Sequence, residues 1–202
     1  MKQAEAIVLG GKVLTCAEDE EVPGPRRGAE MDEVGEIEEG ALAINGGKIA
    51  EVGYARDLLR RWQGEVLDFG ECTILPGFVD AHTHPIFAGS RADEYQMRAE
   101  GLSYEEIHAK GGGIASTVRA TCEASDAELE ALTRRHLKLM LAHGTTTCEA
   151  KSGYGLNTRE ELRELRLLRQ LGQELPLDLT PTFMGAHAIP EEYASQPHAY
   201  VE

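Results

Sequence analysis

The spacing of apolar residues changes near residue 73 of this 202-residue chain. Before that point, short β-branched and aliphatic runs at residues 4–15 and 41–53 are broken by Gly-Gly-Lys or Asn-Gly. Runs of this kind, separated by turn residues, are typical of strands, and we predict a β-hairpin in each segment. Residues 55–62 predict a short helix, and a further strand follows at residues 65–68. The first part of the chain is therefore predicted to be rich in β-structure.

Residues 17–40 separate the two predicted hairpins. They are rich in Asp and Glu and contain the sequence Pro-Gly-Pro. A segment with so little apolar surface cannot order a core of its own, and its turn residues oppose a long regular element. We expect a solvated loop or an extended insertion here, without a function.

Beyond residue 73, predicted strands alternate with amphipathic helices. Strands are predicted at residues 74–79, 145–150 and 177–184. Sequences with the spacing of a capping box predict helix starts at Ser103–Glu106, Ser125–Glu128 and Thr158–Glu161. The inward faces of the two longer helices are predicted to carry Leu129, Leu132, His136, Leu137, Met140 and Leu141 in the first and Leu162, Leu165, Leu168 and Leu171 in the second. This alternation predicts a parallel sheet with right-handed crossovers, and therefore an α/β architecture.

Composition excludes several classes of partner. The chain has 20 Lys and Arg against 35 Asp and Glu, a formal net charge of −15 that would repel a phosphate backbone, so nucleic acid is not expected. No apolar run approaches the length of a membrane span, and no signal peptide is recognisable, so we expect a cytoplasmic protein that does not bind a membrane. The cysteines, Cys16, Cys72, Cys122 and Cys148, form no Cys-x-x-Cys pair and are expected to be reduced structural thiols.

His82 and His84 are the first candidates for chemistry. They stand one residue apart at a predicted strand end, so their side chains project to the same side. Neutral imidazole is a common ligand of zinc, and a carboxylate and a water often complete a catalytic site. Two surface histidines in a loop would share this spacing, so the pair alone does not define a metal site. Asp80 is expected to orient the strand end or a ligand rather than to bind the metal itself.

The residues around this pair narrow the interpretation. The run Leu75–His84 resembles the P-G-hydrophobic-hydrophobic-D-x-H-T-H signature of the amidohydrolase superfamily. Other segments resemble the imidazolonepropionase family of histidine degradation, namely Phe87–Arg91, Ser103–Ile107, Gly111–Ile114, Ser116–Thr121, Glu149–Leu156 and Phe183–Ala188. The resemblance implies the N-terminal part of a (β/α)8 metal-dependent hydrolase barrel, preceded by strands of a small β-sandwich domain. We therefore predict a β-sandwich segment at residues 1–72 and the first, incomplete part of the barrel at residues 73–202.

The resemblance also implies contacts with the substrate, 4-imidazolone-5-propanoate. Arg91, Tyr154 and His187 match residues that bind it. The planar guanidinium of Arg91 suits the propionate carboxylate, and the Tyr154 phenol is a hydrogen-bond donor. His187 would polarise the ring carbonyl, although a third metal ligand and a structural histidine are alternative roles. Tyr104 is a further candidate for the carboxylate and could equally serve in packing.

The reaction implied by the resemblance is hydrolysis of the cyclic amide to N-formimidoyl-L-glutamate, with one zinc or iron ion at His82 and His84. No catalytic proton shuttle is assigned in this chain. The family takes a further His and Asp ligand from later strands, whereas this sequence ends after its third predicted barrel strand. We therefore expect a longer natural chain, a homodimer as in the family, and no activity for these 202 residues alone. Another amidohydrolase, such as a guanine-type deaminase, and an inactive fragment or pseudoenzyme are the alternatives.

Overall fold

The computed structural model describes residues 1–17 and 24–201. The chain divides into two compact units, Met1–Pro76 and Gly77–Glu202. The assignment of residues 1–72 to a β-sandwich and of residues 73–202 to a barrel stays a prediction.

The first unit consists mainly of strands. These are β1 (Lys2–Leu9), β2 (Lys12–Leu14), β3 (Glu36–Glu38), β4 (Gly40–Asn45), β5 (Lys48–Tyr54), β6 (Trp62–Asp68) and β7 (Thr73–Ile74), with a short 3-10 helix η1 (Gly28–Asp32) and helix α1 (Ala55–Arg61). They form two sheets, with strand orders β5-β4-β1-β6 and β3-β2-β7. The predicted hairpin at residues 41–53 is confirmed, because β4 and β5 pair antiparallel.

The predicted hairpin at residues 4–15 is wrong, since β1 and β2 belong to different sheets. Gly10 donates its N–H to the carbonyl of Gly40, and Gly11 donates to the carbonyl of Cys72, both at 3.0 Å. A Cβ at Gly10 would lie 2.8 Å from the Ile74 side chain. The two glycines therefore carry the chain closely past its neighbours from one sheet to the other, and form no hairpin turn.

The predicted loop at residues 17–40 also needs correction. Glu36–Glu38 form β3, which pairs antiparallel with β2. The Lys12 ammonium lies 2.7 Å from the Glu36 carboxylate and 2.9 Å from that of Glu38, so a cation on the neighbouring strand offsets the repulsion between these acids. The part of this prediction that covers residues 18–23 lies outside the described residues.

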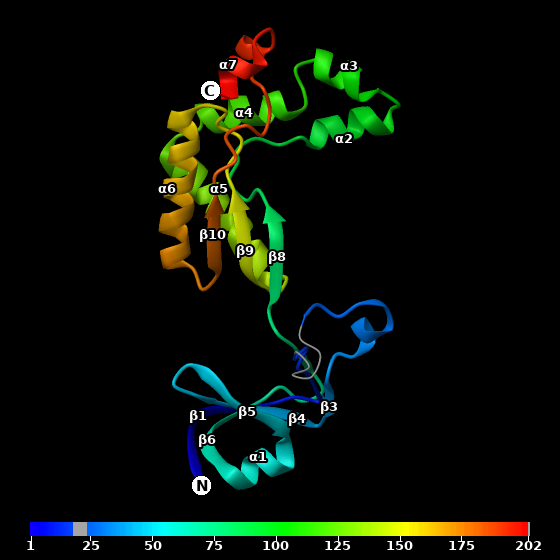
Figure 1. Cartoon of the computed structure of the whole chain (residues 1–202), viewed down its shortest axis with the longest axis vertical. Coiled ribbons are helices and arrows are strands. Elements are labelled where there is room, and N and C mark those ends of the chain that lie inside the picture. The colour runs from blue at the N-terminus through cyan, green and yellow to red at the C-terminus, as the bar shows by residue number, and fades with distance from the viewer. Residues whose placement is uncertain (18–23, 202) are drawn as a thin grey trace. The chain divides into compact units, whose positions relative to one another are not determined.

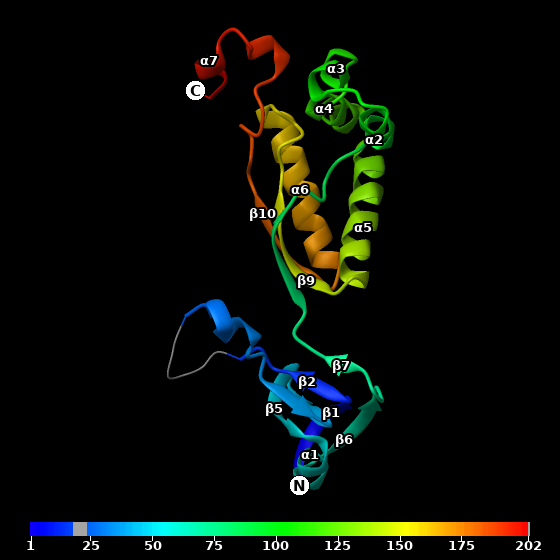
Figure 2. The same cartoon turned by 90° about the vertical axis from the view of Figure 1, so that its right-hand side faces the viewer.

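The second unit is built on a parallel sheet. Its strands are β8 (Phe78–Thr83), β9 (Thr145–Lys151) and β10 (Asp178–Thr182), and its helices are α2 (Ala92–Ala99), α3 (Tyr104–Ala109), α4 (Ile114–Glu123), α5 (Asp126–Ala142), α6 (Thr158–Glu174) and α7 (Pro197–Val201), with a 3-10 helix η2 (Glu191–Tyr193). The strands are adjacent in chain order, and both pairs are parallel. Helices α5 and α6 lie on the same face of this sheet (Figure 2). The predicted mixed α/β architecture is thus confirmed.

Several predicted boundaries shift in this unit. The strand predicted at residues 74–79 divides at Pro76 and Gly77, so that β7 lies in the first unit and β8 opens the second. A Cβ at Gly77 would lie 2.1 Å from the Thr146 hydroxyl, which explains why a glycine begins the second unit. His82 lies within β8 rather than in the loop that follows it.

Helix α6 differs from the prediction in its cap and in its buried face. Asn157, not Thr158, caps the helix, and its side-chain oxygen accepts from the Glu160 N–H at 3.0 Å. Leu162 was predicted to face inward but is 41% exposed, whereas the side chains of Glu161 and Glu164 are buried. Glu160 is buried as well, at 6% exposure, so three glutamates occupy the packed side of the helix near its N-terminus.

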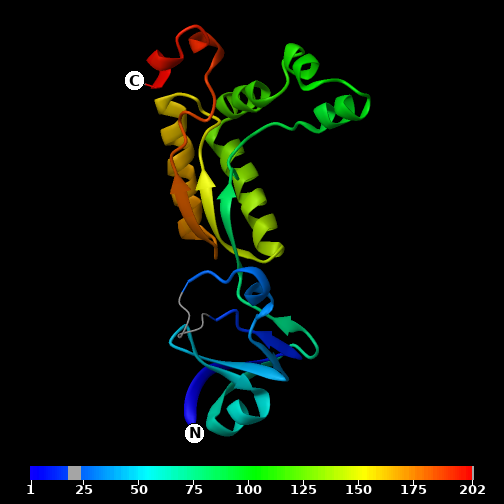
Figure 3. The same ribbon diagram turned by 45° about the vertical axis from the view of Figure 1, so that its right-hand side comes forward.

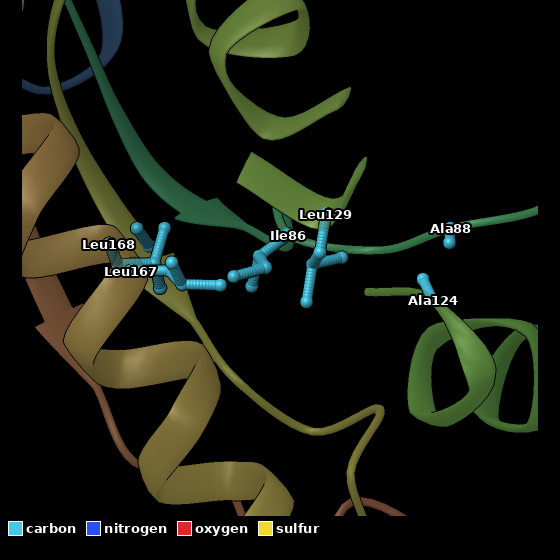
Figure 4. Packing of buried hydrophobic residues seen from close by; sticks show 7 residues of the cluster. Ile86, Ala88, Ala124, Leu129, Leu167 and Leu168 are labelled. Carbon is cyan, nitrogen blue, oxygen red and sulfur yellow. The ribbon is translucent and has the colours of Figure 1, made fainter. Parts of the chain in front are cut away.

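The main core of the second unit holds the chain where it leaves β8. Ile86 is fully buried with Leu129 of α5 and Leu168 of α6, and Figure 4 shows the three side chains converging. Two residues further along, Ala88 donates its N–H to the Thr121 hydroxyl of α4 at 3.0 Å. Beyond this core, α2, α3, α4 and α7 lie past the C-terminal ends of the strands (Figures 1 and 3). The edge of the sheet that carries His82, one residue before the end of β8, is therefore fixed by this core, and the short helices lie beyond it.

Candidate metal and substrate site

Four of the predicted site residues converge at the C-terminal ends of the three parallel strands. The ring centroid of His84 lies 5.7 Å from that of His82, 5.4 Å from that of Tyr154 and 4.7 Å from that of His187. The rings of Tyr154 and His187 meet edge to face, with centroids 5.8 Å apart. His82 and His84 lie at the end of β8, Tyr154 follows β9 and His187 follows β10, and parallel strands deliver their C-terminal loops to the same edge of a sheet. The topology therefore places the four rings together.

His84 has the environment of a metal ligand. Both of its ring nitrogens are buried, and neither has a hydrogen-bond partner among the described residues. Burial lowers the pKa of His84, the neighbouring His187 and His82 lower it further, and the Ser152 backbone opposes the shift. An uncharged imidazole with free nitrogens is the form that coordinates a metal ion. Within residues 1–17 and 24–201, however, no group of three or more His, Cys, Asp or Glu side chains is arranged to hold one.

The ends of the three strands are tied together by side chains that the sequence did not reveal. The Thr83 hydroxyl donates to the carbonyl of Glu149 at 2.7 Å. The Glu149 carboxylate accepts from the Lys151 ammonium at 2.6 Å and from the Thr182 hydroxyl at 2.9 Å, and the Lys151 contact is the main reason that its pKa is lowered. Asp80 accepts from the N–H of His82 at 3.2 Å, so it orients the strand end as predicted. These contacts fix the backbone from which the histidines project.

Arg91 and Tyr104 lie on the outer part of the site. Arg91 donates through Nε and Nη2 to one oxygen of Glu94, at 2.8 and 2.6 Å. The other oxygen of Glu94 accepts from the N–H of Gly113 at 2.8 Å, so this carboxylate links the arginine to the start of α4. The phenols of Tyr104 and Tyr154 both lie near enough to raise the pKa of Arg91, although Glu94 is the main cause. Glu94 was missed because its helix, α2, has no buried face to give an apolar pattern.

A cavity of about 570 Å³ borders one residue of each group, and none of His82, His84, His187 and Tyr104 lines it. Arg91 and Tyr154 both line it, together with Phe87, Thr117 and His136. The imidazole of His136 stacks on the Phe87 ring at 4.5 Å between centroids, and its Nδ1 lies 2.8 Å from the Pro85 carbonyl oxygen. Burial raises the pKa of Tyr154, while Arg91 opposes the shift, so the phenol keeps its proton and remains a hydrogen-bond donor. The cavity therefore offers cationic and neutral donors next to the histidine cluster.

The cysteines offer no nucleophile to this site. All four are free. Burial raises the pKa of Cys122 to about 11, and the nearby carboxyl groups of Glu160 and Glu164 raise it further. Burial also raises the pKa of the Cys148 thiol. Both thiols stay protonated near neutral pH and are therefore poor nucleophiles.

Several solved structures share the fold of this chain. The chain superimposes on E. coli guanine deaminase with a TM-score of 0.62 at 18% identity, over 92% of this chain and 39% of that one. It superimposes on the zinc-bound atrazine chlorohydrolase TrzN of Arthrobacter aurescens TC1 with a TM-score of 0.53 at 15% identity, over 88% and 35% of the two chains. The fold is that of amidohydrolase-type deaminases and hydrolases. No helix among residues 1–17 and 24–201 is long and apolar enough to cross a bilayer.

The sequence relatives are proteins named imidazolonepropionase. The chain is 53% identical over 182 residues to the imidazolonepropionase of Solibacter usitatus, which is 89% of this chain and 44% of that protein. It is 44% identical over 207 residues to the imidazolonepropionase of Symbiobacterium thermophilum, with coverages of 100% and 48%. No family model matches the chain. The chain is thus related to the imidazolonepropionases, as its sequence predicts, and it spans slightly less than half the length of these relatives.

Proposed function

We propose that the protein carrying this chain hydrolyses 4-imidazolone-5-propanoate to N-formimidoyl-L-glutamate, a step of histidine degradation. In this reaction water adds to the ring carbonyl carbon, the C–N bond of the cyclic amide breaks, and the leaving nitrogen takes a proton. The observation that carries the proposal is the convergence of His84, Tyr154 and His187 at three strand ends, with both His84 nitrogens free of partners. The relation to proteins named imidazolonepropionase supports the choice of substrate.

His82 and His84 would hold the metal ion, zinc or iron. The two buried nitrogens of His84 without partners fit this role, and the zinc reported for the similarly folded TrzN supports it. A bound divalent ion supplies hydroxide from water near neutral pH and polarises a carbonyl group. Catalytic zinc takes about three protein ligands, so we expect at least one more from a part of the protein beyond the described residues.

The remaining site residues would bind and orient the substrate. Arg91 uses Nε and Nη2 for Glu94, so its Nη1 group would be the one to bind the propionate carboxylate. Tyr154 would donate its phenolic proton to the substrate, and Tyr104 would assist at the carboxylate. His187 would donate to the ring carbonyl and stabilise the charge that develops there.

The same relationship supports a larger architecture. We propose that the first unit is a segment of a β-sandwich domain, because its strands form two separate sheets. The second unit would be the first part of a (β/α)8 barrel, because β8, β9 and β10 are parallel, adjacent in chain order and covered by helices on one face. We also propose that the protein forms a homodimer, as expected for the family. Residues 1–202 by themselves would not turn over the substrate.

The decisive assay offers 4-imidazolone-5-propanoate to the protein carrying this sequence and measures the N-formimidoyl-L-glutamate formed. We expect product with the native sequence and none with His84→Ala. The fold likeness to guanine deaminase favours a second candidate, removal of an exocyclic amine. Release of ammonia from guanine, without opening of the imidazolone ring, would replace the first proposal by the second.

A further inference from the structure

The loop that carries Tyr154 is held by a buried carboxylate of the helix that follows it. Glu161 of α6 is only 1% exposed, and its Oε1 accepts two backbone hydrogen bonds, from Gly155 at 2.9 Å and from Leu156 at 2.8 Å. Leu156 has a φ of +50°, a conformation that is uncommon for residues other than glycine. One buried oxygen thus satisfies two backbone donors that would otherwise be left without partners, so this contact can hold an unfavourable turn in place.

The geometry of the loop leaves little freedom around this contact. A Cβ at Gly155 would lie 2.7 Å from the Glu161 backbone nitrogen, so the loop packs directly against the first turn of α6. Ser152, which is fully buried, accepts from the N–H of Met184 at 3.0 Å and so ties the same loop to the segment that leads into His187. A Cβ at Gly153 would lie 3.0 Å from the Cβ of His187. The position of the Tyr154 loop therefore also constrains the position of His187.

Glu164 provides a natural comparison on the same helix. It lies three residues after Glu161 and is equally buried, at 1% exposure, but neither of its carboxyl oxygens has a hydrogen-bond partner among the described residues. Burial, and then the charge of Glu161, raises the pKa of Glu164 to about 8, while the backbones of Tyr154 and Gly153 oppose the shift. Glu164 therefore also lies against the backbone of the Tyr154 loop, but Glu161 is the acid that accepts the hydrogen bonds of 2.9 and 2.8 Å from Gly155 and Leu156.

We propose that Glu161 is a positioning residue, which sets the place of the Tyr154 phenol beside His84 and His187 through the backbone N–H groups of Gly155 and Leu156. The rate consequences of this inference rest on the proposed function. The anchor itself does not, because it is a property of the loop.

A double-mutant cycle tests whether Glu161 acts through Tyr154. Glu161→Ala should lower kcat/KM for 4-imidazolone-5-propanoate by about tenfold, since a small misplacement of a binding group is costly. In a Tyr154→Phe background the same change should cost less than about twofold, because two changes that remove one contact are not additive. Glu161→Asp, which is too short to reach both N–H groups, should behave like the alanine variant and serves where that variant does not fold. An equal loss of rate in both backgrounds, or no loss with Tyr154 present, overturns the inference.

Hydrogen exchange gives a readout that needs no substrate. The amides of Gly155 and Leu156 should be protected in the native protein and in the Glu164→Gln control, and should exchange at least about tenfold faster after Glu161→Ala or Glu161→Asp. Unchanged protection in both Glu161 variants contradicts the inference, whatever the enzyme assay shows. If the protection is lost as expected but the native protein does not open the imidazolone ring, the proposed function fails and the anchor stands.

Discussion

The candidate site has two parts that are held in different ways. His84, Tyr154 and His187 follow strands whose ends are bonded to one another, and the chain beyond His84 is pinned by the buried Ile86. Arg91, by contrast, belongs to the start of a short helix with no buried residue, and its side chain is 46% exposed. The first part is built on the core of the sheet, whereas the second depends on one carboxylate, that of Glu94. Under the proposed function, the strand ends would fix the reacting groups and the short helices would hold the tail of the substrate.

Replacing His187 should have the largest effect on the chemical step. We expect His187→Ala to lower kcat by about a hundredfold or more, because a donor to developing charge at a carbonyl is worth roughly that much in rate. KM should change little if the role is confined to the transition state. Steady-state kinetics on 4-imidazolone-5-propanoate measure both constants. A large rise in KM with kcat unchanged would show instead that His187 binds the tail of the substrate and does not act on the ring carbonyl.

Replacing Arg91 should show the opposite pattern. A hydrogen bond to a charged group contributes about 1.5 to 3 kcal/mol, so Arg91→Ala should raise KM by roughly ten- to a hundredfold with a smaller effect on kcat. Arg91→Lys should recover only part of the loss, because an ammonium group lacks the planar fork. If a substrate analogue without the propionate were affected to the same degree, Arg91 would not bind that carboxylate.

The buried carboxyl group of Glu164, next to the Tyr154 loop, makes the stability of the strand-end part depend on pH. Its pKa of about 8 lies above the usual value of 4.5, so the folded state keeps a proton that the unfolded chain loses as pH rises from 4.5 to 8. The native protein should lose stability over that window, and Glu164→Gln removes this dependence. Relative to the native protein, the variant should gain about 3 to 4 kcal/mol between pH 5 and pH 8.

Denaturant midpoints at the two pH values give the measurement for Glu164. Glu105→Gln, at an exposed position of α3, is the matched control and should show no such gain. A pH-independent difference between Glu164→Gln and the native protein would show that Glu164 is ionised in the fold.

Glu94 should give the smallest effect and test the outer part directly. Glu94→Gln keeps a group of the same shape but removes the charge that pairs with Arg91, at a cost of about 1 kcal/mol. We expect KM to rise by about fivefold, with kcat unchanged. In an Arg91→Ala background the Glu94 change should have almost no further effect. Equal losses in both backgrounds would mean that Glu94 acts through Gly113 and α4 instead.

The sequence predicts the strand-end part of the site better than the outer part. Apolar strands followed by helical spacing are enough to expect a parallel sheet, and residues after parallel strands must meet at one edge. This is why His82, His84, Tyr154 and His187 are found together. Arg91 and Glu94 have the i,i+3 spacing of a helical ion pair, but the sequence does not announce the helix that brings them together, because α2 carries no apolar stripe and its first turn has no capping side chain.

Two predictions about the fold were wrong for the same physical reason. Leucines at helical spacing suggested that Leu162 faces inward, but backbone N–H groups of the Tyr154 loop need acceptors, and Glu161 supplies one from the same helix. Gly10 and Gly11 suggested a hairpin turn, but their lack of side chains serves close packing between two sheets. In the first case the backbone donors of a loop decided which face of the helix is buried. In the second case a chain segment distant in the sequence decided the path of the backbone. The local spacing of residues reveals neither.

Metal content is the most direct test of the central claim that His82 and His84 bind a metal ion. The native protein carrying this sequence should contain about one zinc or iron ion per chain and should hydrolyse 4-imidazolone-5-propanoate. His84→Ala should lose both the metal and the activity. His143→Ala, which removes an exposed ring bonded to the Leu139 carbonyl at the end of α5, should keep both. Full metal occupancy and an unchanged rate in the His84 variant would contradict the account.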